Sequence, residues 1–481
     1  MLNERVEKLL LTPVLLTLLY TTWVWGGGRL SFHKPVLWVA GLLLVMLFLL
    51  PLFLAPSVER LHTLGRNVRK ILLDPFFFSG LLFVAYLVIQ LWNAGRTLVF
   101  DIPSAGWIYS QPRVPGWPSA FTKKEALQMI EWFFPAWVLV LTLRSDWFQR
   151  GTLQKLLYII VYSSGLLSLF GLVQYGSKTH SIYWQTPLDC HFFASFGYSN
   201  HAAAYFVLTG ALATGLLFRE IFRPGEKGKR LRITLLILST VLCMTGANLS
   251  LSRAGVILAW SFMLLAAIYG LKRAWKQLSP AARANMLAAT LGIVGIFYFL
   301  VAGFGEEAII NEFIYGADKL RPDQTILRML YTELAERPFL CDAAWRIWKD
   351  NELFGIGGWG YRYLLALYVQ RKFWMNVGLQ GGGWANVHCD PLQFLLEFGA
   401  VGFGLLLLSI VMLLFAVFRQ AEWRSSLLWM SLSGLALVGV FSLIDLPFRC
   451  PAILYTWVTI LAVMPKLTRR ETRVKLRGTP Q

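Results

Sequence analysis

Charged residues are scarce in this sequence. Only 15% of its 481 residues are Asp, Glu, Lys or Arg, whereas soluble domains carry about 25%. Hydrophobic residues make up 56% of the chain, and the mean hydropathy is +0.56. Because so few charged residues cannot cover the surface of a soluble protein of this length, we expect a membrane protein.

Cysteine is also rare, and metal-binding patterns are missing. The five cysteines are too few for a disulfide scaffold, and none forms a Cys-x-x-Cys or Cys/His metal spacing. A bridge between outer cysteines is permitted in an oxidising compartment, but the sequence does not select a pair. No Asp-x-Asp motif of nucleotide-sugar transferases occurs in an outer loop. We therefore expect neither a metal nor a cofactor.

Long apolar runs are abundant. About 20 residues of helix cross a bilayer, and twelve segments have the required character. The predicted spans are 9–25, 36–55, 73–92, 128–143, 155–175, 201–218, 233–249, 254–270, 286–303, 392–417, 426–443 and 451–465. The first resembles a signal peptide, but no small-residue cleavage site follows it, so we expect an anchor. The predicted fold is an all-α polytopic transmembrane bundle.

The spans divide the chain into four regions. Residues 1–303 hold the first nine spans, and residues 304–391 form a mostly helical outer loop domain. The last three spans occupy 392–465, and a basic tail covers 466–481.

The distribution of basic residues predicts the orientation. With the N-terminus inside, more than half of the 45 lysines and arginines fall on short cytoplasmic segments, as the positive-inside rule requires. Both termini are then cytoplasmic, and the loop domain lies outside. The net charge of +19 reflects this orientation and attraction to anionic lipid. Because no nucleic-acid-binding motif is present, we expect no nucleic-acid partner.

One stretch, Trp384 to Gly404 (WANVHCDPLQFLLEFGAVGFG), joins a polar turn to an apolar helix. Asp390 is a favourable N-cap, Pro391 suits the first turn, and Gln393 completes a capping box. His388 then lies just before a helix N-terminus, whose positive end disfavours imidazolium and leaves the ring available as a general base. A structural role for this histidine is the alternative.

Two more turns place polar groups between apolar helices. FGYSNHAAAYF puts Asn200 and His201 at the start of a span, where a functional role and ordinary capping by Ser199 or Asn200 are equally open. LSLSRAGVILAW puts Ser252 and Arg253 in a tight turn. An arginine there costs several kcal/mol unless it faces a wet cavity or an anion, so we expect a functional residue, with snorkelling to the interface as the alternative.

The outer domain should contain two helices. DQTILRMLYTELAE, residues 323–336, has helical spacing and ends before Arg337, and a second helix is expected over 342–351. The glycine-rich turn FGIGGWGY follows. It is not a nucleotide-binding P-loop, because no Gly-Lys-Ser/Thr sequence comes after it.

The last outer turn, SLIDLPFRCPA, carries Asp445 and Arg449 between the final two spans. In the predicted topology, Arg449 lies on the same side of the membrane as Arg253, Arg337 and His388. The outer ends of several helices are therefore expected to present polar groups to one site.

Four of these motifs resemble those of the O-antigen ligase and O-antigen polymerase superfamily, bacterial membrane glycosyltransferases that use undecaprenyl-diphosphate-linked glycans. FGYSNHAAAYF is similar to the family's Gly-x-x-Asn-x-x-Ala helix start, and LSLSRAGVILAW to its Ser-Arg-Gly/Ala-Gly turn. ERPFLCDAAWRIWKDNELFGIGGWGY resembles an Arg-led loop helix ending in Pro-x-x-Gly-x-Gly. VHCDPLQFLLEFGAVG resembles His-Asn-x-x-Leu-Gln-x-x-x-Glu-x-Gly-x-x-Gly. Departures at Glu352, Cys389 and Pro391 leave the subfamily and the acceptor open.

The resemblance implies a GT-C-like bundle in the bacterial inner membrane with its active site facing the periplasm. It implies transfer of a glycan from an undecaprenyl-diphosphate carrier to a glycan or lipid A-core hydroxyl, by a metal-independent inverting reaction. The implied catalytic base is His388. The implied diphosphate ligands are Arg253, Arg337 and Arg449, whose planar forks bind oxyanions. The implied supporting residues are Asn200, His201, Ser252 and Asp390.

Other functions fit parts of the same pattern. A repeat-unit polymerase for O-antigen or exopolysaccharide, or a protein O-oligosaccharyltransferase, would share these motifs. A transporter of lipid-linked glycan would use the arginines as counter-ions, but transporters place charges near the bilayer midplane and often contain repeats. Here the polar groups cluster at helix ends, which favours the transferase.

Overall fold

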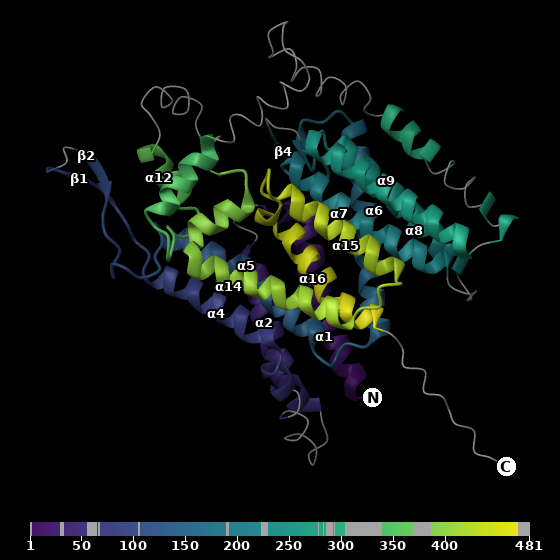
Figure 1. Ribbon diagram of the computed structural model, residues 1–481, viewed down its shortest axis with the longest axis horizontal. Helices are drawn as coiled ribbons and strands as arrows, with labels where there is room; N and C mark the ends of the chain where they lie inside the picture. The colour runs from purple at the N-terminus through teal and green to yellow at the C-terminus, as the bar shows by residue number, and fades with distance from the viewer. Residues whose placement is uncertain are drawn as a thin grey trace, which may run out of the picture.

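The chain is described by a computed structural model. It covers residues 2–28, 33–54, 65, 68–103, 106–188, 192–222, 229–277, 279–281, 283–284, 292, 294–303, 339–368 and 386–469. Within these residues the protein is a bundle of long helices, which confirms the predicted all-α polytopic fold (Figure 1). Arg337, the helix expected over 323–336 and most of the basic tail lie outside the described residues.

A helix overlaps each of the twelve predicted spans. Nine helices among the described residues are long and apolar enough to cross a membrane: α2 (His33–Leu54), α4 (Pro75–Trp92), α5 (Lys123–Arg144), α6 (Arg150–Gly176), α7 (Ser199–Ile221), α8 (Lys229–Leu249), α9 (Arg253–Gln277), α14 (Asp390–Gln420) and α16 (Pro451–Thr468). The other three spans overlap α1 (Leu2–Trp23), the helix Val294–Gly303 and α15 (Ser426–Phe441).

Local sequence signals set several helix ends. Asp74 caps α4 by accepting from the backbone N–H of Phe76 at 3.1 Å, with Pro75 at the first position. Thr122 caps α5 by accepting from Glu125 N–H at 3.2 Å. Arg144, at the end of α5, grips Asp74 with Nε and Nη2 at 2.7 and 3.0 Å. This fork ties the start of α4 to the end of α5.

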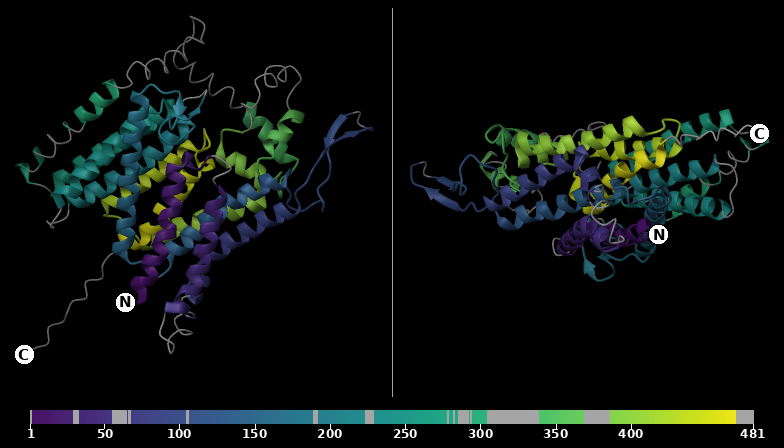
Figure 2. Two further views of the ribbon diagram at one scale, coloured as in Figure 1. Left: turned by 180° about the vertical axis from the view of Figure 1, so that it is seen from behind. Right: turned by 90° about the horizontal axis from the view of Figure 1, so that it is seen from below.

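Helix α7 is buried along most of its length. Its residues from Ala202 to Leu217 are all buried, and α8 and α15 pack along it (Figure 2). Small side chains make the close approach possible, because a Cβ on Gly210 would lie 2.2 Å from Met244 and one on Gly434 2.5 Å from Ala211. Helix packing inside membranes depends on such small residues.

A second, smaller core lies beyond one end of the bundle. A helix over 339–349 and α12 (Tyr361–Tyr368) bury Leu340, Ile347 and Tyr361 against Phe121 and Leu396. The second loop helix, which was expected over 342–351, therefore begins at residue 339 and ends at residue 349. The rest of the predicted 304–391 domain, at 304–338 and 369–385, lies outside the described residues.

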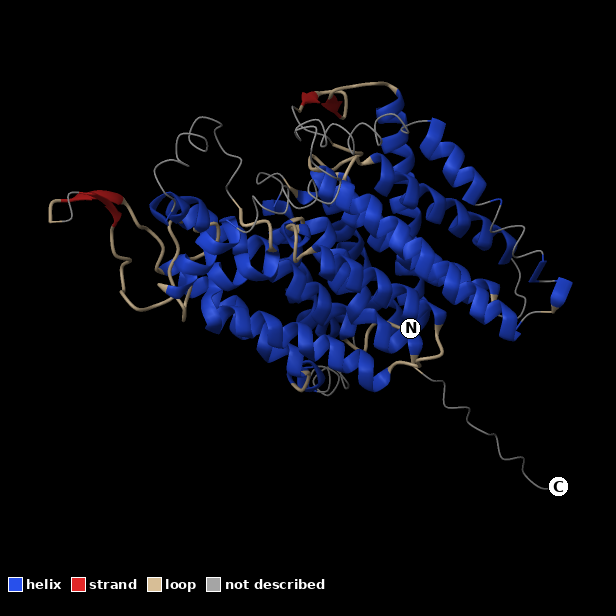
Figure 3. Cartoon of the chain, turned by 45° about the horizontal axis from the view of Figure 1, so that its top comes forward, coloured by secondary structure: helices blue, strands red, loops and turns tan. Residues whose placement is uncertain are grey.

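Strands are few and peripheral in the described chain (Figure 3). β1 (Leu98–Asp101) pairs antiparallel with β2 (Gly106–Tyr109), with Leu98 opposite Tyr109, and the hairpin projects from the bundle. β3 (Ser181–Ile182) pairs with β4 (Thr186–Pro187). Two short 3₁₀ helices, η1 (Trp25–Gly27) and η4 (Pro447–Arg449), complete the elements.

Helix α14 is interrupted at Gly399, whose φ of 60° and ψ of −176° are open only to glycine. The loop 352–357 fills the break. Ile356 and Gly357 donate their N–H groups to the carbonyls of Leu396 and Glu397 at 3.1 and 2.8 Å. The second, smaller core is thus hydrogen-bonded into a membrane helix.

Candidate active site

Four turns from distant parts of the sequence meet at one end of the bundle. They are the start of α7 at Asn200, the start of α9 at Ser252, the turn before α14 at His388, and the turn after α15 at Asp445. A continuous set of hydrogen bonds joins them. The described residues therefore bring Asn200, Ser252, His388 and Asp445 together, whereas the predicted partner Arg337 lies outside them.

His388 and Asp445 form the centre of this set. Nδ1 of His388 lies 3.4 Å from Oδ1 of Asp445, and the side chains are 26% and 1% exposed. In the neutral ring, a proton on Nδ1 would be donated to the carboxylate, which can only accept, and Nε2 would then be the nitrogen able to accept a proton. A partly exposed imidazole with this polarity is suited to general-base chemistry.

Asp445 is held from several sides. Its carboxylate accepts from the Leu446 backbone N–H at 2.8 Å and from the Tyr198 hydroxyl at 3.0 Å. The Asn200 amide also donates to it. With so many donors fixing one buried carboxylate, the orientation of His388 is fixed in turn.

Asn200 and Ser252 connect this pair to Arg253. The Ser252 hydroxyl donates to Asn200 Oδ1 at 2.5 Å and accepts from the Gly255 N–H at 3.0 Å, so it also begins α9. Arg253 is the next residue and is partly buried. The predicted alternative, that Ser199 or Asn200 caps α7, is wrong because Tyr198 is the N-cap of this helix. The Asn200 side chain instead donates to Asp445.

His201 lies beside the pair without joining it. Its Nε2 is 3.0 Å from the Leu446 carbonyl, and Tyr198 contacts its ring edge-on at 4.9 Å between centroids. The ring therefore supports the turn that carries Asp445.

The start of α14 differs from the predicted capping box. The helix begins at Asp390, one residue early, with Cys389 as N-cap and no side-chain cap. The Asp390 carboxylate accepts from the Phe448 N–H at 2.8 Å, and its own N–H bonds the Ser442 carbonyl at 2.9 Å. Asp390 thus fastens α14 to the final turn instead of capping its own helix.

Gln393 links the His388 turn to a second charged pair. Its Oε1 accepts from the Val387 N–H at 2.7 Å, and its Nε2 donates to Glu397 at 2.8 Å. Glu397 accepts from Nη2 of Arg449. Gln393 and Glu397 were not predicted as site residues, although their four-residue spacing in the motif places both on one helix face.

Arg449 is enclosed. The side chains of Arg449 and Glu397 are 3% and 0% exposed, and the guanidinium lies 4.6 Å from the ring centre of Trp359 and 5.2 Å from that of Phe394. Its Nε and Nη1 have no hydrogen-bond partner among the described residues. Binding of diphosphate by Arg449 stays a prediction, and its defined contact is with Glu397.

Cys389 follows the proposed base in sequence. Burial raises the pKa of its thiol, and the nearby Asp390 carboxylate raises it further. A raised pKa leaves less of the thiol as the nucleophilic thiolate. Within the described part of the chain, no three His, Cys, Asp or Glu side chains come together as a metal site.

Comparison with known proteins identifies one region of the chain. Residues 233–407 match the family model for O-antigen ligase. The matched region contains Ser252, Arg253, Arg337 and His388, and it confirms the family resemblance predicted from the motifs. No curated protein matches the chain.

Proposed function

We propose, from its O-antigen ligase region, that this membrane protein transfers a glycan from an undecaprenyl-diphosphate carrier to an acceptor hydroxyl. The family match supports a membrane glycosyltransferase of the ligase and polymerase type. The donor, a lipid A-core acceptor and the metal-independent mechanism are our proposals. So are an inner-membrane location, cytoplasmic termini and a periplasmic site.

The proposed reaction is a single displacement. The bond between sugar C1 and the diphosphate oxygen breaks, and a bond from C1 to the acceptor oxygen forms on the opposite face, which inverts the configuration. The hydroxyl proton passes to Nε2 of His388. The electron pair of the broken bond leaves on undecaprenyl diphosphate, so atoms and charge balance without another reactant.

The observation that carries this proposal is the contact between His388 and the buried Asp445. A histidine that gains a proton becomes a cation, and a buried carboxylate beside Nδ1 stabilises that cation. The same contact favours the tautomer in which Nε2 can accept. A purely structural histidine would not need one nitrogen kept available at a partly exposed position.

The arginines have the complementary task. Arg253 begins α9 one residue after Ser252, which is hydrogen-bonded through Asn200 to Asp445. Charge develops on the leaving diphosphate as the bond breaks, and guanidinium groups stabilise it with two parallel donors. We assign Arg253 and Arg337 to this role.

Reconstitution with a purified lipid-diphosphate glycan tests the proposal. Vesicles containing the protein receive donor together with lipid A-core, a second glycan repeat or an acceptor protein, and products are identified by mass. Added mass on lipid A-core supports the ligase, whereas added mass on the repeat or protein reassigns the acceptor. Movement of intact donor across the bilayer without any transfer would contradict the proposal and identify a transporter.

A further inference from the structure

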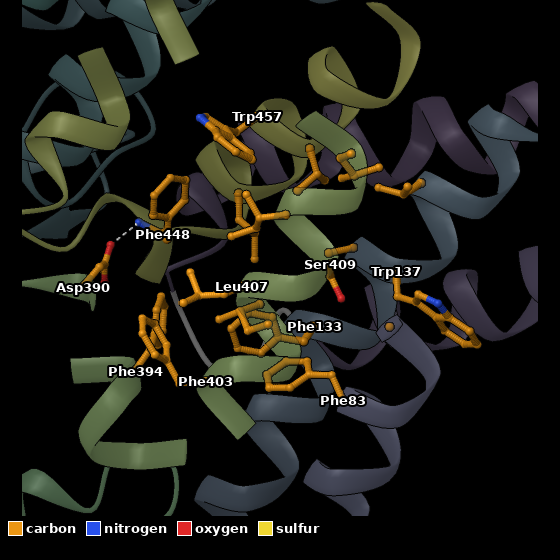
Figure 4. A pocket seen from close by; sticks show the side chains of 18 of the residues that line it. Phe83, Phe133, Trp137, Asp390, Phe394, Phe403, Leu407, Ser409, Phe448 and Trp457 are labelled. Atoms are coloured by element: carbon orange, nitrogen blue, oxygen red, sulfur yellow. Dashed lines mark hydrogen bonds between the residues drawn. The ribbon is translucent and has the colours of Figure 1, made fainter. Parts of the chain in front are cut away.

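A charged pocket lies between the start of α4 and the end of α5. Its volume is about 190 Å³, and its charged lining residues are Lys70, Asp74, Arg144 and Asp146. A larger cavity of about 280 Å³ lies between the same two helices, α14 and α16 (Figure 4). That cavity has aromatic and aliphatic walls, with Asp390 as its single charged residue. The two cavities therefore suit ligands of different chemistry.

The charged pocket is at the end of the bundle opposite the candidate active site. Helix α16 begins at Pro451, two residues after Arg449, and Lys466 near its other end donates to the carbonyl of Ser145, a lining residue, at 2.5 Å. From Pro451 to Lys466 the helix rises roughly 22 Å. The hydrocarbon core of a bilayer is about 30 Å thick, so the pocket lies near the opposite membrane surface. In the proposed topology it faces the inner leaflet.

The more enclosed half of the pocket is the ion pair between Arg144 and Asp74. Arg144 donates from Nε and Nη2 at 2.7 and 3.0 Å, and the two side chains are 17% and 18% exposed. Within the described residues, these two bonds use two of the five N–H donors of the guanidinium. Donors therefore remain for an oxyanion that enters the pocket.

The outer half of the pocket is a second ion pair. Lys70 donates to Asp146, and both side chains are 56% exposed. Together the two pairs give the pocket two cations and two carboxylates, so its formal charge is zero. A simple anion would meet as many carboxylates as cations. A zwitterion instead can place its anionic group against the cations and its cationic group against the carboxylates, which is the complementary arrangement.

Apolar surface borders the charged groups. Ile71 and Leu141 line the pocket, and Leu72 and Leu73, just before its Asp74, are 39% and 68% exposed. These leucines come directly before the membrane helix α4, so lipid chains reach them. A ligand with a zwitterionic head and hydrocarbon tails therefore matches both the pocket and its border.

We infer that this pocket binds the phosphoethanolamine headgroup of a membrane phospholipid. The phosphate oxygens accept from Lys70 and Arg144, and the primary ammonium donates to Asp74 and Asp146. The bound lipid joins the start of α4 to the end of α5, as the fork between Arg144 and Asp74 already does. The inference goes beyond the proposed transfer reaction and does not depend on it.

Two exposed ion pairs at this end of the bundle provide matched variants. Lys70→Gln with Asp146→Asn removes one cation and one carboxylate of the pocket. Glu4→Gln with Lys8→Gln removes a 2.8 Å pair at the start of α1, outside the pocket wall. The first turns of α1 contact the turn after α5, so this control lies at the same end. Both double variants keep the net charge, and because exposed pairs contribute little stability, neither should unfold the protein.

The first measurement is native mass spectrometry of the full chain. The protein is released from vesicles of phosphatidylethanolamine, phosphatidylcholine and phosphatidylglycerol in equal amounts. Phosphatidylcholine keeps both charges but has no N–H to donate, and phosphatidylglycerol has no cation. We expect the wild type and the α1 control to retain phosphatidylethanolamine. The pocket double variant should retain roughly tenfold less, because the loss of one charge-assisted hydrogen bond is worth about that factor.

Three results would overturn the inference. They are equal retention of the three lipids, preferential retention of phosphatidylglycerol, and equal retention of phosphatidylethanolamine by the two double variants. Preference for phosphatidylglycerol would identify an anion site instead.

The second measurement is thermal melting in detergent with each lipid added. Phosphatidylethanolamine should raise the melting temperature of the wild type and the α1 control by mass action, and the pocket double variant should lose most of this rise. Soluble phosphoethanolamine, at concentrations where the lipid stabilises, should leave the melting temperature unchanged. Equal stabilisation by the soluble compound would overturn the assignment to a membrane lipid. Neither measurement requires a glycan donor, so failure of the proposed transfer would leave these results intact.

Discussion

His388 occupies a backbone conformation that non-glycine residues rarely adopt, with φ at +56°. Such positions cost about 1–3 kcal/mol and persist only where neighbouring contacts impose them. Here Val387 N–H is bonded to Gln393 and Asp390 N–H to Ser442, on either side of the turn. The strain directs the imidazole toward Asp445, which is consistent with a functional constraint on this residue.

The first prediction concerns His388→Ala. Base assistance is worth about 10²–10⁴-fold, so transfer should fall by that order while donor affinity changes little. In the wild type the rate should fall as pH drops, because a protonated imidazole cannot accept a proton. A pH–rate series on both proteins, with donor binding measured separately, should display an acid limb in the wild type alone.

His180→Ala serves as its control, because His180 is exposed and outside the polar cluster. This variant should keep the wild-type rate and acid limb. If His388→Ala retains both, the base lies elsewhere and His201 becomes the next candidate.

Arg253 carries the second prediction. Arg253→Ala should weaken donor binding and turnover while the protein stays folded, and Arg337→Ala should act similarly. Arg253→Lys should rescue poorly, since an ammonium cannot reproduce the two-pronged grip on phosphate. Binding of labelled undecaprenyl diphosphate checks this, and full turnover by Arg253→Ala would remove the residue from the mechanism.

Some of the site residues could be predicted from the sequence and others could not. His388 and Arg253 stood out because ionisable groups beside apolar helices are costly. Glu397 did not, because it lies inside an apolar helix and its partner Arg449 is 52 residues away. Asp445 was visible as a polar turn residue, but its contact with His388 depends on tertiary packing.

At the scale of elements, the break in α14 allows a third prediction. A Cβ on Gly399 would lie 2.4 Å from the backbone N of Gly355, and its φ disfavours other residues. Gly399→Ala should therefore cost at least about 1–3 kcal/mol of stability. Thermal melting followed by size-exclusion chromatography measures this. Gly404→Ala, with nothing within 4 Å of its Cβ, should melt like the wild type.

The buried pair between α14 and η4 yields the fourth prediction. Removing one partner of such a pair leaves an unpaired charge and typically costs 3–5 kcal/mol. Arg449→Met alone should lower the melting temperature markedly, and Arg449→Met with Glu397→Met should recover most of it. If Arg449→Met instead melts normally and loses only donor affinity, Arg449 acts on the diphosphate, as the resemblance implies.

Helix positions were predictable, whereas helix starts at the site were not. Apolar run length identified α14 and α7 because the bilayer demands about 20 apolar residues. The prediction of a capping box at Asp390 was wrong because both side chains bond elsewhere: Gln393 accepts from the Val387 N–H and Asp390 from the Phe448 N–H. Tertiary hydrogen bonds displaced the local signal at the place where the site is built.

At the scale of the whole molecule, both described ends of the chain lie at the same end of the bundle (Figure 1). Scarce charge and long apolar runs were enough to predict this class of fold. The second, smaller core was harder to predict, since it joins Phe121, Leu340 and Leu396 from three distant segments. No periodic pattern relates residues that far apart.

The fifth prediction is the topology. A phosphatase fused near Gln380 should be active outside the membrane, and one fused at the C-terminus should be inactive, because short-loop lysines and arginines stay inside. The opposite pattern of activity would reverse the orientation and move the site to the cytoplasm.

The hydrogen bonds that insert the loop 352–357 into the break of α14 have a geometric consequence. They hold the second, smaller core at one height along a membrane helix, and the His388 turn is at the start of that helix. In the proposed function, transfer would then be confined to a thin plane parallel to the bilayer surface. An acceptor anchored in the same bilayer shares that plane, so its hydroxyl samples a two-dimensional layer at high effective concentration. A freely diffusing acceptor has no such advantage.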